Sequence, residues 1–262
     1  MLGIFRSKPI LSDENFQFQV ETFRWLMKHF GGDAFFKETV LVLPTKEFFP
    51  AEVNSAEEAV TETFAQVKKF SGLEEWPCTL IKQETDIESR VAPTLAVSGA
   101  PSGPHGTFSA DAEKVEITYN PALASDPVQL VATFAHELAH YLTATAQEDP
   151  PGGWDNWEFA TDLCAVFLGF GVFMANSALN FRQYTNVDSQ GWAYQQNGYL
   201  SETELVYSLA IFSMLKGLEF GEVSKNLKPS LAKIFKKSVK ELSSKTEIIN
   251  EIKSVKCVAV YS

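Results

Sequence analysis

The chain has 262 residues, with 33 acidic against 22 basic side chains and a formal net charge of −11. It lacks the positive field that displaces counterions from nucleic acid, so we expect no nucleic-acid partner. The length allows a substantial core, and we expect one domain over residues 1–262.

The lack of a secretory signal and the spacing of the cysteines favour a cytosolic location. The N-terminal residues 1–9 lack the apolar core and cleavage site of a secretory signal. Cys78, Cys164 and Cys257 show no framework spacing, which favours a reducing compartment. The most apolar stretch, Leu163–Ala175, is too short to cross a bilayer, so we expect a buried helix and no membrane span.

The first predicted elements alternate helices with strands. An amphipathic helix is expected over Asp13–Phe30, where Gly31 and Gly32 end it. The β-branched run Thr39–Leu43 predicts a strand closed by Pro44. Ser55 caps a helix that runs to about residue 70, and residues 78–83 predict a second strand.

A Gly/Pro-rich loop over residues 98–106 is followed by two short predicted strands, 106–110 and 114–119. They would form a hairpin around Asp111. The first 125 or so residues are therefore expected to hold a mixed or antiparallel sheet with helices.

A long apolar helix is predicted next. Asp126 is its expected N-cap, Pro127 its first residue and Gln129 the closing member of a capping box. The helix should run to about Ala146, and Glu137 is the one charged residue between Val128 and that end apart from the histidines.

This helix carries the motif His136-Glu137-Leu138-Ala139-His140. Histidines at i and i+4 lie about 40° apart on one helix face, where they can bind one metal ion. The glutamate between them can then act on a water molecule without binding the metal. The alternative is a pair of hydrogen-bonded core histidines.

Glu158 is the expected third ligand, because it opens a second helical segment, with seventeen residues between it and His140. Asp162, four residues later on the same face, could orient a ligand histidine. Cys164 lies on another face of that helix. Two alternatives remain: Glu158 could complete a capping box from Asp155, and Asp162 could be a solvated first-turn charge.

The two helices together resemble the gluzincin zinc metallopeptidases, of which thermolysin is a member. The resemblance covers about residues 114–175 and identifies no subfamily. It implies a zincin-like fold in which His136, His140 and Glu158 bind one zinc ion. By the same pattern Glu137 would be the general base and Asp162 would orient a histidine.

No histidine follows His140, which excludes the metzincin pattern. It also departs from thermolysin, which uses a later histidine to stabilise the oxyanion. That role would fall to another residue, for which the candidates are Tyr194, Tyr199, Arg182 and His105.

The remaining sequence predicts helices. Ser201 and Glu204 form a capping box, and Gly217 ends the helix that they begin. A further helix over residues 228–242 has a basic, solvated face. We therefore expect an α+β, zincin-like domain with a sheet-containing part over about 1–125 and a helical, metal-binding part over about 126–262.

The expected function is a zinc-dependent hydrolase that cleaves amide bonds in a peptide or protein substrate. By resemblance, extended substrate would add to a sheet edge near the metal helix. Two other hypotheses remain open. One is a non-catalytic regulatory or interaction protein of the same fold with bound zinc, and the other is a metal-free helical scaffold.

Overall fold

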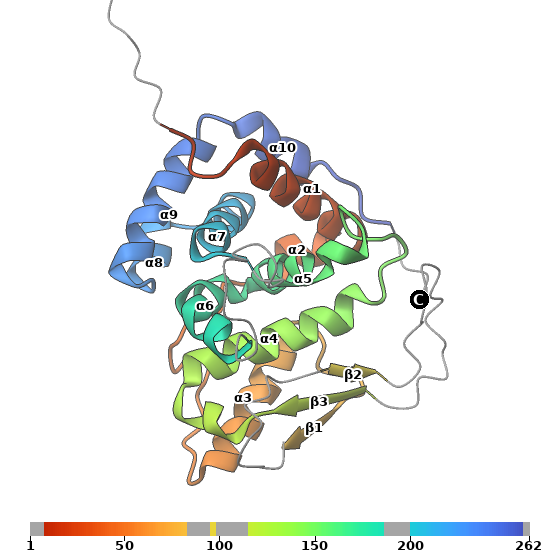
Figure 1. Cartoon of the computed structure of the whole chain (residues 1–262), viewed down its shortest axis with the longest axis vertical. Helices are drawn as coiled ribbons and strands as arrows, with labels where there is room; N and C mark the ends of the chain where they lie inside the picture. Colours follow the sequence, from red (N-terminus) through yellow and green to blue (C-terminus); the bar gives the residue numbers. More distant parts are fainter. Residues whose placement is uncertain (1–7, 83–94, 98–114, 186–199, 259–262) are drawn as a thin grey trace, which may run out of the picture.

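The computed structural model describes residues 8–82, 95–97, 115–185 and 200–258. This part of the chain is mostly helical with one small sheet, which confirms the α+β class (Figure 1). The helices are α1 (Asp13–Phe30), α2 (Gly32–Lys37), α3 (Ala56–Phe70), α4 (Pro127–Thr143), α5 (Trp157–Ala165), α6 (Gly171–Thr185), α7 (Glu202–Lys216), α8 (Phe220–Lys225), α9 (Pro229–Leu242) and α10 (Thr246–Lys253). Short helical turns are η1 (Pro121–Ser125), η2 (Trp154–Asn156) and η3 (Val166–Phe170), and the strands are β1 (Thr79–Lys82), β2 (Leu95–Val97) and β3 (Val115–Tyr119).

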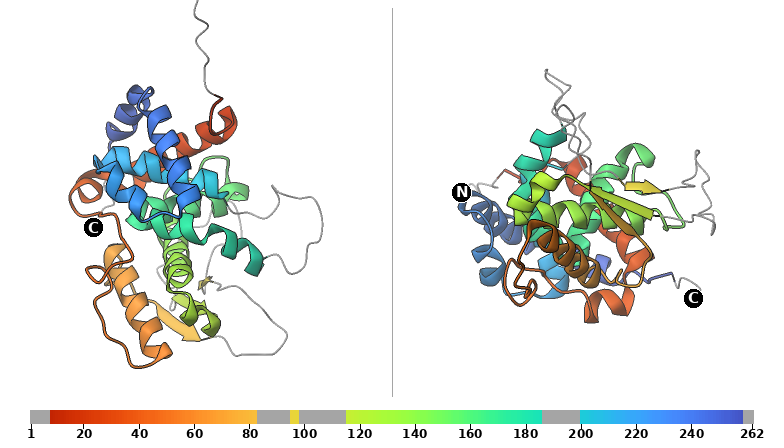
Figure 2. Two further views of the ribbon diagram at one scale, coloured as in Figure 1. Left: turned by 90° about the vertical axis from the view of Figure 1, so that its left-hand side faces the viewer. Right: turned by 90° about the horizontal axis from the view of Figure 1, so that it is seen from below.

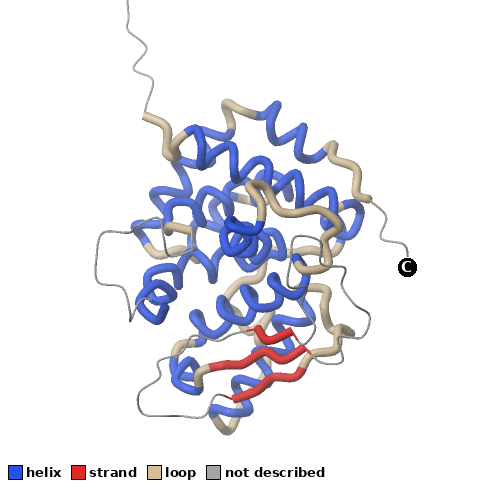
Figure 3. Tube along the Cα trace, turned by 45° about the vertical axis from the view of Figure 1, so that its right-hand side comes forward, coloured by secondary structure: helices blue, strands red, loops and turns tan. Residues whose placement is uncertain are grey.

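The sheet is small (Figure 3) and mixed, as expected. The central strand β3 pairs in parallel with β1 and antiparallel with β2. β1 and β3 confirm the strands predicted over 78–83 and 114–119, whereas the short strand β2 was not predicted. The predicted hairpin partner over 106–110 lies outside the described residues.

The strand predicted over Thr39–Leu43 was wrong. This segment joins no ladder among the described strands, and its Val42 N–H instead donates to the carbonyl of Gly169, at 3.0 Å. Its β-branched, apolar composition serves burial against a helical kink, which periodicity alone cannot distinguish from burial in a sheet.

Helix α4 runs through the middle of the molecule. In Figure 1, α3 and the sheet lie below it, while α5, α6 and α7 lie above it, with α1, α9 and α10 further out. The side view in Figure 2 (left) shows the same arrangement. Helix α4 contacts α3, β2, α5 and α6, so it is covered from both sides. This position explains why every residue of α4 from Gln129 to Thr143 is buried.

Below α4, aromatic side chains join the three elements. Phe134 of α4 meets Phe64 of α3 edge-on at a ring-centroid distance of 5.0 Å and Tyr119 of β3 at 6.4 Å. β3 alternates buried and half-buried side chains, which is the pattern of a strand with one face in a core. Phe134 therefore anchors α4 on the sheet side, away from its histidines.

Above α4, the elements α5, η3 and α6 form one continuous helical path, which bends at Gly169. That glycine has φ +101°, and an added Cβ would lie 2.0 Å from the carbonyl oxygen of Val40. A π-helical turn with a positive φ is a common cause of a sharp kink. Because the path bends here, α5 and α6 can both pack along α4.

The same path includes the most apolar stretch of the chain. Within the described ranges, Trp154–Ala178 is one helical stretch long and apolar enough to cross a membrane by length and composition alone. The protein itself buries 89% of the 18-residue window that meets this criterion. Core helices of large domains share this composition.

The predicted helices α1, α3, α7 and α9 are confirmed, and the first three have side-chain caps. The Ser12 and Ser55 hydroxyls accept hydrogen bonds from the backbone at the starts of α1 and α3. Ser201 and Glu204 form the reciprocal capping box of α7, and Gly217 ends that helix in the left-handed conformation. In α9 the lysines Lys233, Lys236, Lys237 and Lys240 are exposed, as expected for a solvated face.

Candidate metal centre

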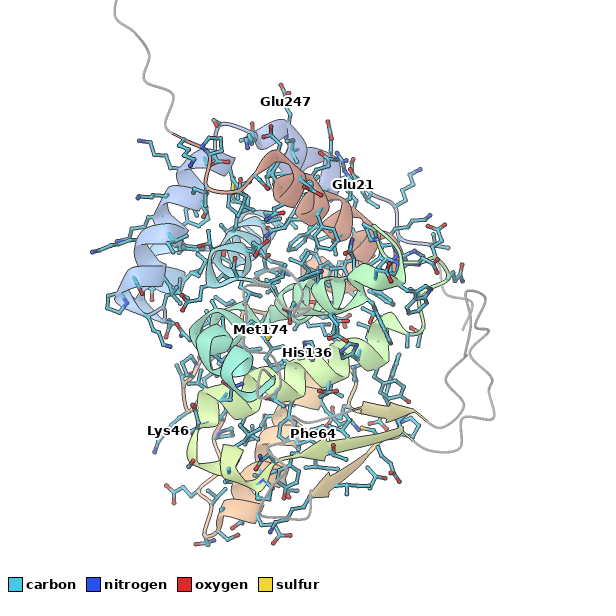
Figure 4. The ribbon with its side chains drawn as sticks, in the orientation of Figure 1. Glu21, Lys46, Phe64, His136, Met174 and Glu247 are labelled. Carbon is cyan, nitrogen blue, oxygen red and sulfur yellow. The ribbon has the colours of Figure 1, made fainter. Side chains whose placement is uncertain are left out.

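The start of α4 fixes the register of the motif. The Asp126 side chain accepts a hydrogen bond from the backbone N–H of Gln129, and Pro127 occupies the first turn. With this start, His136 and His140 lie on the face of α4 that packs against α5. Figure 4 shows the His136 side chain in this position. Only 2% of His136 and 8% of His140 are exposed.

The turn between α4 and α5 reverses the chain and so returns Glu158 and Asp162 to the side of α4. Gly152 and Gly153 have φ values of +80° and +77°, which only glycine adopts without strain. The chain then passes through η2 into α5, which packs against α4. This connection places Glu158 and Asp162 opposite the two histidines.

Three side-chain atoms converge between the helices. Glu158 Oε2 lies 3.4 Å from His136 Nε2 and 3.2 Å from His140 Nε2. One ligand atom from each of these residues falls within 4.8 Å of the others. In a tetrahedral zinc site with bonds near 2.1 Å, ligand atoms are about 3.4 Å apart. The three residues can therefore hold a metal ion with little movement.

The far nitrogen of each imidazole is also engaged. His136 Nδ1 lies 3.0 Å from Asp162 Oδ1, and His140 Nδ1 lies 3.2 Å from Thr161 Oγ1. When each Nδ1 carries the proton and donates it outward, each Nε2 keeps its lone pair toward Glu158. This is the tautomer that a metal-binding histidine requires.

Thr161, Thr143 and Trp157 all contact His140, and none of the three was predicted from the sequence. Thr161 lies three residues after Glu158 and so shares its face of α5, which is the signal that could have identified it. Thr143 Oγ1 donates to the His140 carbonyl and accepts a hydrogen bond from Trp157 Nε1 at 3.0 Å. These contacts fix the backbone and ring of His140.

The charges of the cluster are strongly coupled. Burial lowers the pKa of His136, but hydrogen bonds to Asp162 and Glu158 outweigh it and raise that pKa to about 10. Burial and the neighbouring His136 lower the pKa of His140. Burial alone would raise the pKa of Glu158, yet its hydrogen bonds to both histidines lower it. Without a metal, the cluster thus favours one positive charge on its imidazoles, which a bound cation would replace.

The two alternative roles, a capping box for Glu158 and a solvated charge for Asp162, do not fit these contacts. Asn156, the N-cap of α5, makes no side-chain cap hydrogen bond, and Glu158 reaches the histidines instead. Asp162 is 3% exposed, so it is not a solvated first-turn charge. Both carboxylates face α4.

Glu137 follows His136 on α4 and is 4% exposed. It contributes an electrostatic interaction to His136, which places its charge beside the cluster. It is not one of the three converging residues. That Glu137 acts as a general base remains a prediction.

The polar face of α4 extends beyond the motif. Gln129 and Thr133 lie eight and four residues before Glu137, on the same side of the helix. Both are buried, and neither Gln129 Oε1 nor Thr133 Oγ1 has a hydrogen-bond partner among the described atoms. An unpartnered buried oxygen costs about 1–3 kcal/mol, so this stripe is unusual for a core.

The four candidates for oxyanion stabilisation remain predictions. Tyr194, Tyr199 and His105 lie outside the described residues, as does the side chain of Arg182 in α6.

Comparisons with known proteins assign no family. No protein-family model matches the chain, and neither curated proteins nor solved structures give a match. The gluzincin resemblance therefore depends on the motif residues and on the geometry above.

Proposed function

We propose that the protein is a zinc-dependent hydrolase that cleaves amide bonds, with peptides as substrates. The observation that carries the proposal is the convergence of His136 Nε2, His140 Nε2 and Glu158 Oε2, with Glu137 buried next to His136 on the same helix. Two histidines and one carboxylate form a ligand set typical of catalytic zinc, which leaves a coordination position open.

Each residue has a definite task in this proposal. Zinc, when bound, supplies a Lewis acid that lowers the pKa of water toward neutrality. Glu137 takes a proton from the attacking water at its carboxylate and passes it to the nitrogen of the leaving amine. Asp162 and Thr161 hold the two imidazoles with Nε2 directed at the ligand position.

The position of β2 supports a peptide as substrate. Among the described strands β2 is an edge strand, and it contacts α4. An extended peptide can add to such an edge through main-chain hydrogen bonds and so lie along the helix that carries Glu137.

The metal site is tested by metal content. Protein purified without chelators and loaded with zinc should retain about one ion per chain by mass spectrometry, and Glu158→Ala should lose it or bind it far more weakly. Glu74→Ala, which changes an exposed carboxylate, is the matched control. Full zinc retention in Glu158→Ala would remove Glu158 from the site.

The reaction is tested by a peptide library whose products are identified by mass spectrometry. Zinc-loaded wild type should cleave, and Glu137→Gln should keep its zinc but lose at least about 10²-fold in rate. A fully loaded wild type that cleaves nothing would favour a non-catalytic zinc protein. Cleavage by Glu137→Gln at the wild-type rate would refute the mechanism.

A further inference from the structure

An exposed tryptophan lies next to the metal centre. Trp154 of η2 is 45% exposed, the highest value among the large apolar side chains that the structure describes. Its exposed ring offers a large apolar surface on which an apolar group can be buried. Trp154 is also connected to His140 by ring contacts through Trp157.

The Trp154 ring rests on a fixed support. It packs edge-on against Trp157 at 4.9 Å, and Trp157 packs edge-on against His140 at the same distance. The hydrogen bond from Trp157 Nε1 to Thr143 Oγ1 holds the middle ring in place. A preorganised ring of this kind binds an apolar group with little loss of side-chain entropy.

The metal centre opens toward these tryptophans. The Glu158 side chain is 41% exposed, whereas those of His136 and Asp162 are 2% and 4% exposed. Glu158 directly follows Trp157, so the solvent side of the cluster is the first turn of α5. Two ring contacts in series place Trp154 within about 10 Å of the His140 ring. An extended peptide advances about 3.3 Å per residue, so this distance covers the side chains within about three residues of the reacting bond.

We propose that Trp154, supported by Trp157, forms a subsite for a large apolar or aromatic side chain of the substrate, close to the bond that is cleaved. The inference rests on the proposed function and adds the substrate class, which is peptides with such a side chain near the cleavage point. Trp154 is then a specificity residue that contacts substrate and takes no part in proton transfer.

The test uses hydroxamic acids, which bind zinc through two oxygens and need no known substrate. Acetohydroxamate is compared by calorimetry with a series of phenylalkyl hydroxamates of increasing linker length, on zinc-loaded protein. At the best linker length the phenyl compound should bind about tenfold tighter than acetohydroxamate. Trp154→Ala should abolish this preference and leave acetohydroxamate affinity unchanged, while Trp154→Phe should keep part of it.

Phe220→Ala is the control, because Phe220 is a similarly exposed aromatic at 37%, on α8 rather than on η2. It should keep the full preference. An unchanged preference in Trp154→Ala, or tighter binding of an aminoalkyl hydroxamate than of the phenyl compound, would overturn the apolar subsite alone. Failure of zinc-loaded protein to bind acetohydroxamate would count against the proposed function and the subsite together.

Discussion

Both oxygens of Asp162 accept a hydrogen bond. His136 Nδ1 lies 3.0 Å from one, and the backbone N–H of Leu200 donates to the other at 2.9 Å. The carboxylate thus connects the candidate metal centre to the residue that precedes the N-cap of α7. A neutral amide cannot accept at both positions, so this residue is a sensitive test of how His136 is held.

Replacement of Asp162 by Asn should weaken zinc binding by about 10- to 100-fold. The amide NH₂ would face either a second donor at Leu200 or His136 Nδ1, and the latter contact favours the tautomer with the proton on Nε2. Competition against a chromophoric chelator measures the effect, with Asp155→Asn at an exposed position as the control. Equal affinity in both variants would show that Asp162 does not orient the ligand.

Thr133→Val tests the unpartnered stripe on α4. The Thr133 hydroxyl is buried without a partner, and Val has nearly the same shape, so the substitution should raise the free energy of unfolding by about 1 kcal/mol. Urea unfolding measures it, with Thr143→Val as the comparison that should destabilise, because that hydroxyl has two partners. A loss of stability in Thr133→Val would mean that a buried water or ligand bonds this hydroxyl.

At the scale of elements, the kink at Gly169 determines how α5 and α6 meet α4. Its carbonyl accepts from Val42 N–H, and its Cα faces the Val40 carbonyl too closely for a side chain. Residues 39–43, predicted as a strand, therefore pack against the kink and stabilise it. Without the bend, the path that carries Glu158 could not also cover the first half of α4.

We expect Gly169→Ala to lower the free energy of unfolding by about 3 kcal/mol, because it combines a positive φ with a backbone clash. Gly221→Ala is the matched control: Gly221 is inside α8 with open space around it, so alanine there should stabilise by up to about 1 kcal/mol. Urea midpoints compare the two. Equal midpoints would show that the kink relaxes without cost.

At the scale of the whole molecule, Glu241 of α9 joins segments far apart in the sequence. Its carboxylate accepts hydrogen bonds from the Ile10 backbone N–H, the Tyr207 hydroxyl of α7 and Lys245 Nζ, at 2.9 to 3.0 Å. Partial burial would raise its pKa, but these three donors lower it below the usual range. The charged form is thus favoured in the folded protein.

A lowered folded-state pKa gives stability that is fully present above the unfolded value, near 4.3, and is lost as the pH falls through the folded value. Glu241→Gln should therefore unfold more easily than wild type at neutral pH, by about 1 kcal/mol, and the difference should shrink below about pH 4. Thermal unfolding against pH measures it. The exposed Glu247→Gln, labelled in Figure 4, should match wild type throughout. A Glu241→Gln deficit that persists unchanged at low pH would contradict the argument.

The sequence by itself determined where several helices begin and which residues make up much of the candidate site. Ser55, Asp126 and Ser201 cap helices where expected, because capping involves residues only two or three positions apart. His136 and His140 share a face for the same local reason. Glu158 could be expected from its spacing after His140, and the structure then placed it between the two imidazoles.

Only the tertiary structure decided contacts between distant segments. The partner of β3, the packing of residues 39–43 against the kink, and the packing of α1 from the N-terminus against α10 depend on chain reversals that local propensity does not encode. The hydrogen bonds from Leu200 to Asp162 and from Ile10 to Glu241 are of the same kind. Local order follows from neighbouring residues, whereas the pairing of remote ones follows from which apolar surfaces the whole chain can bury together.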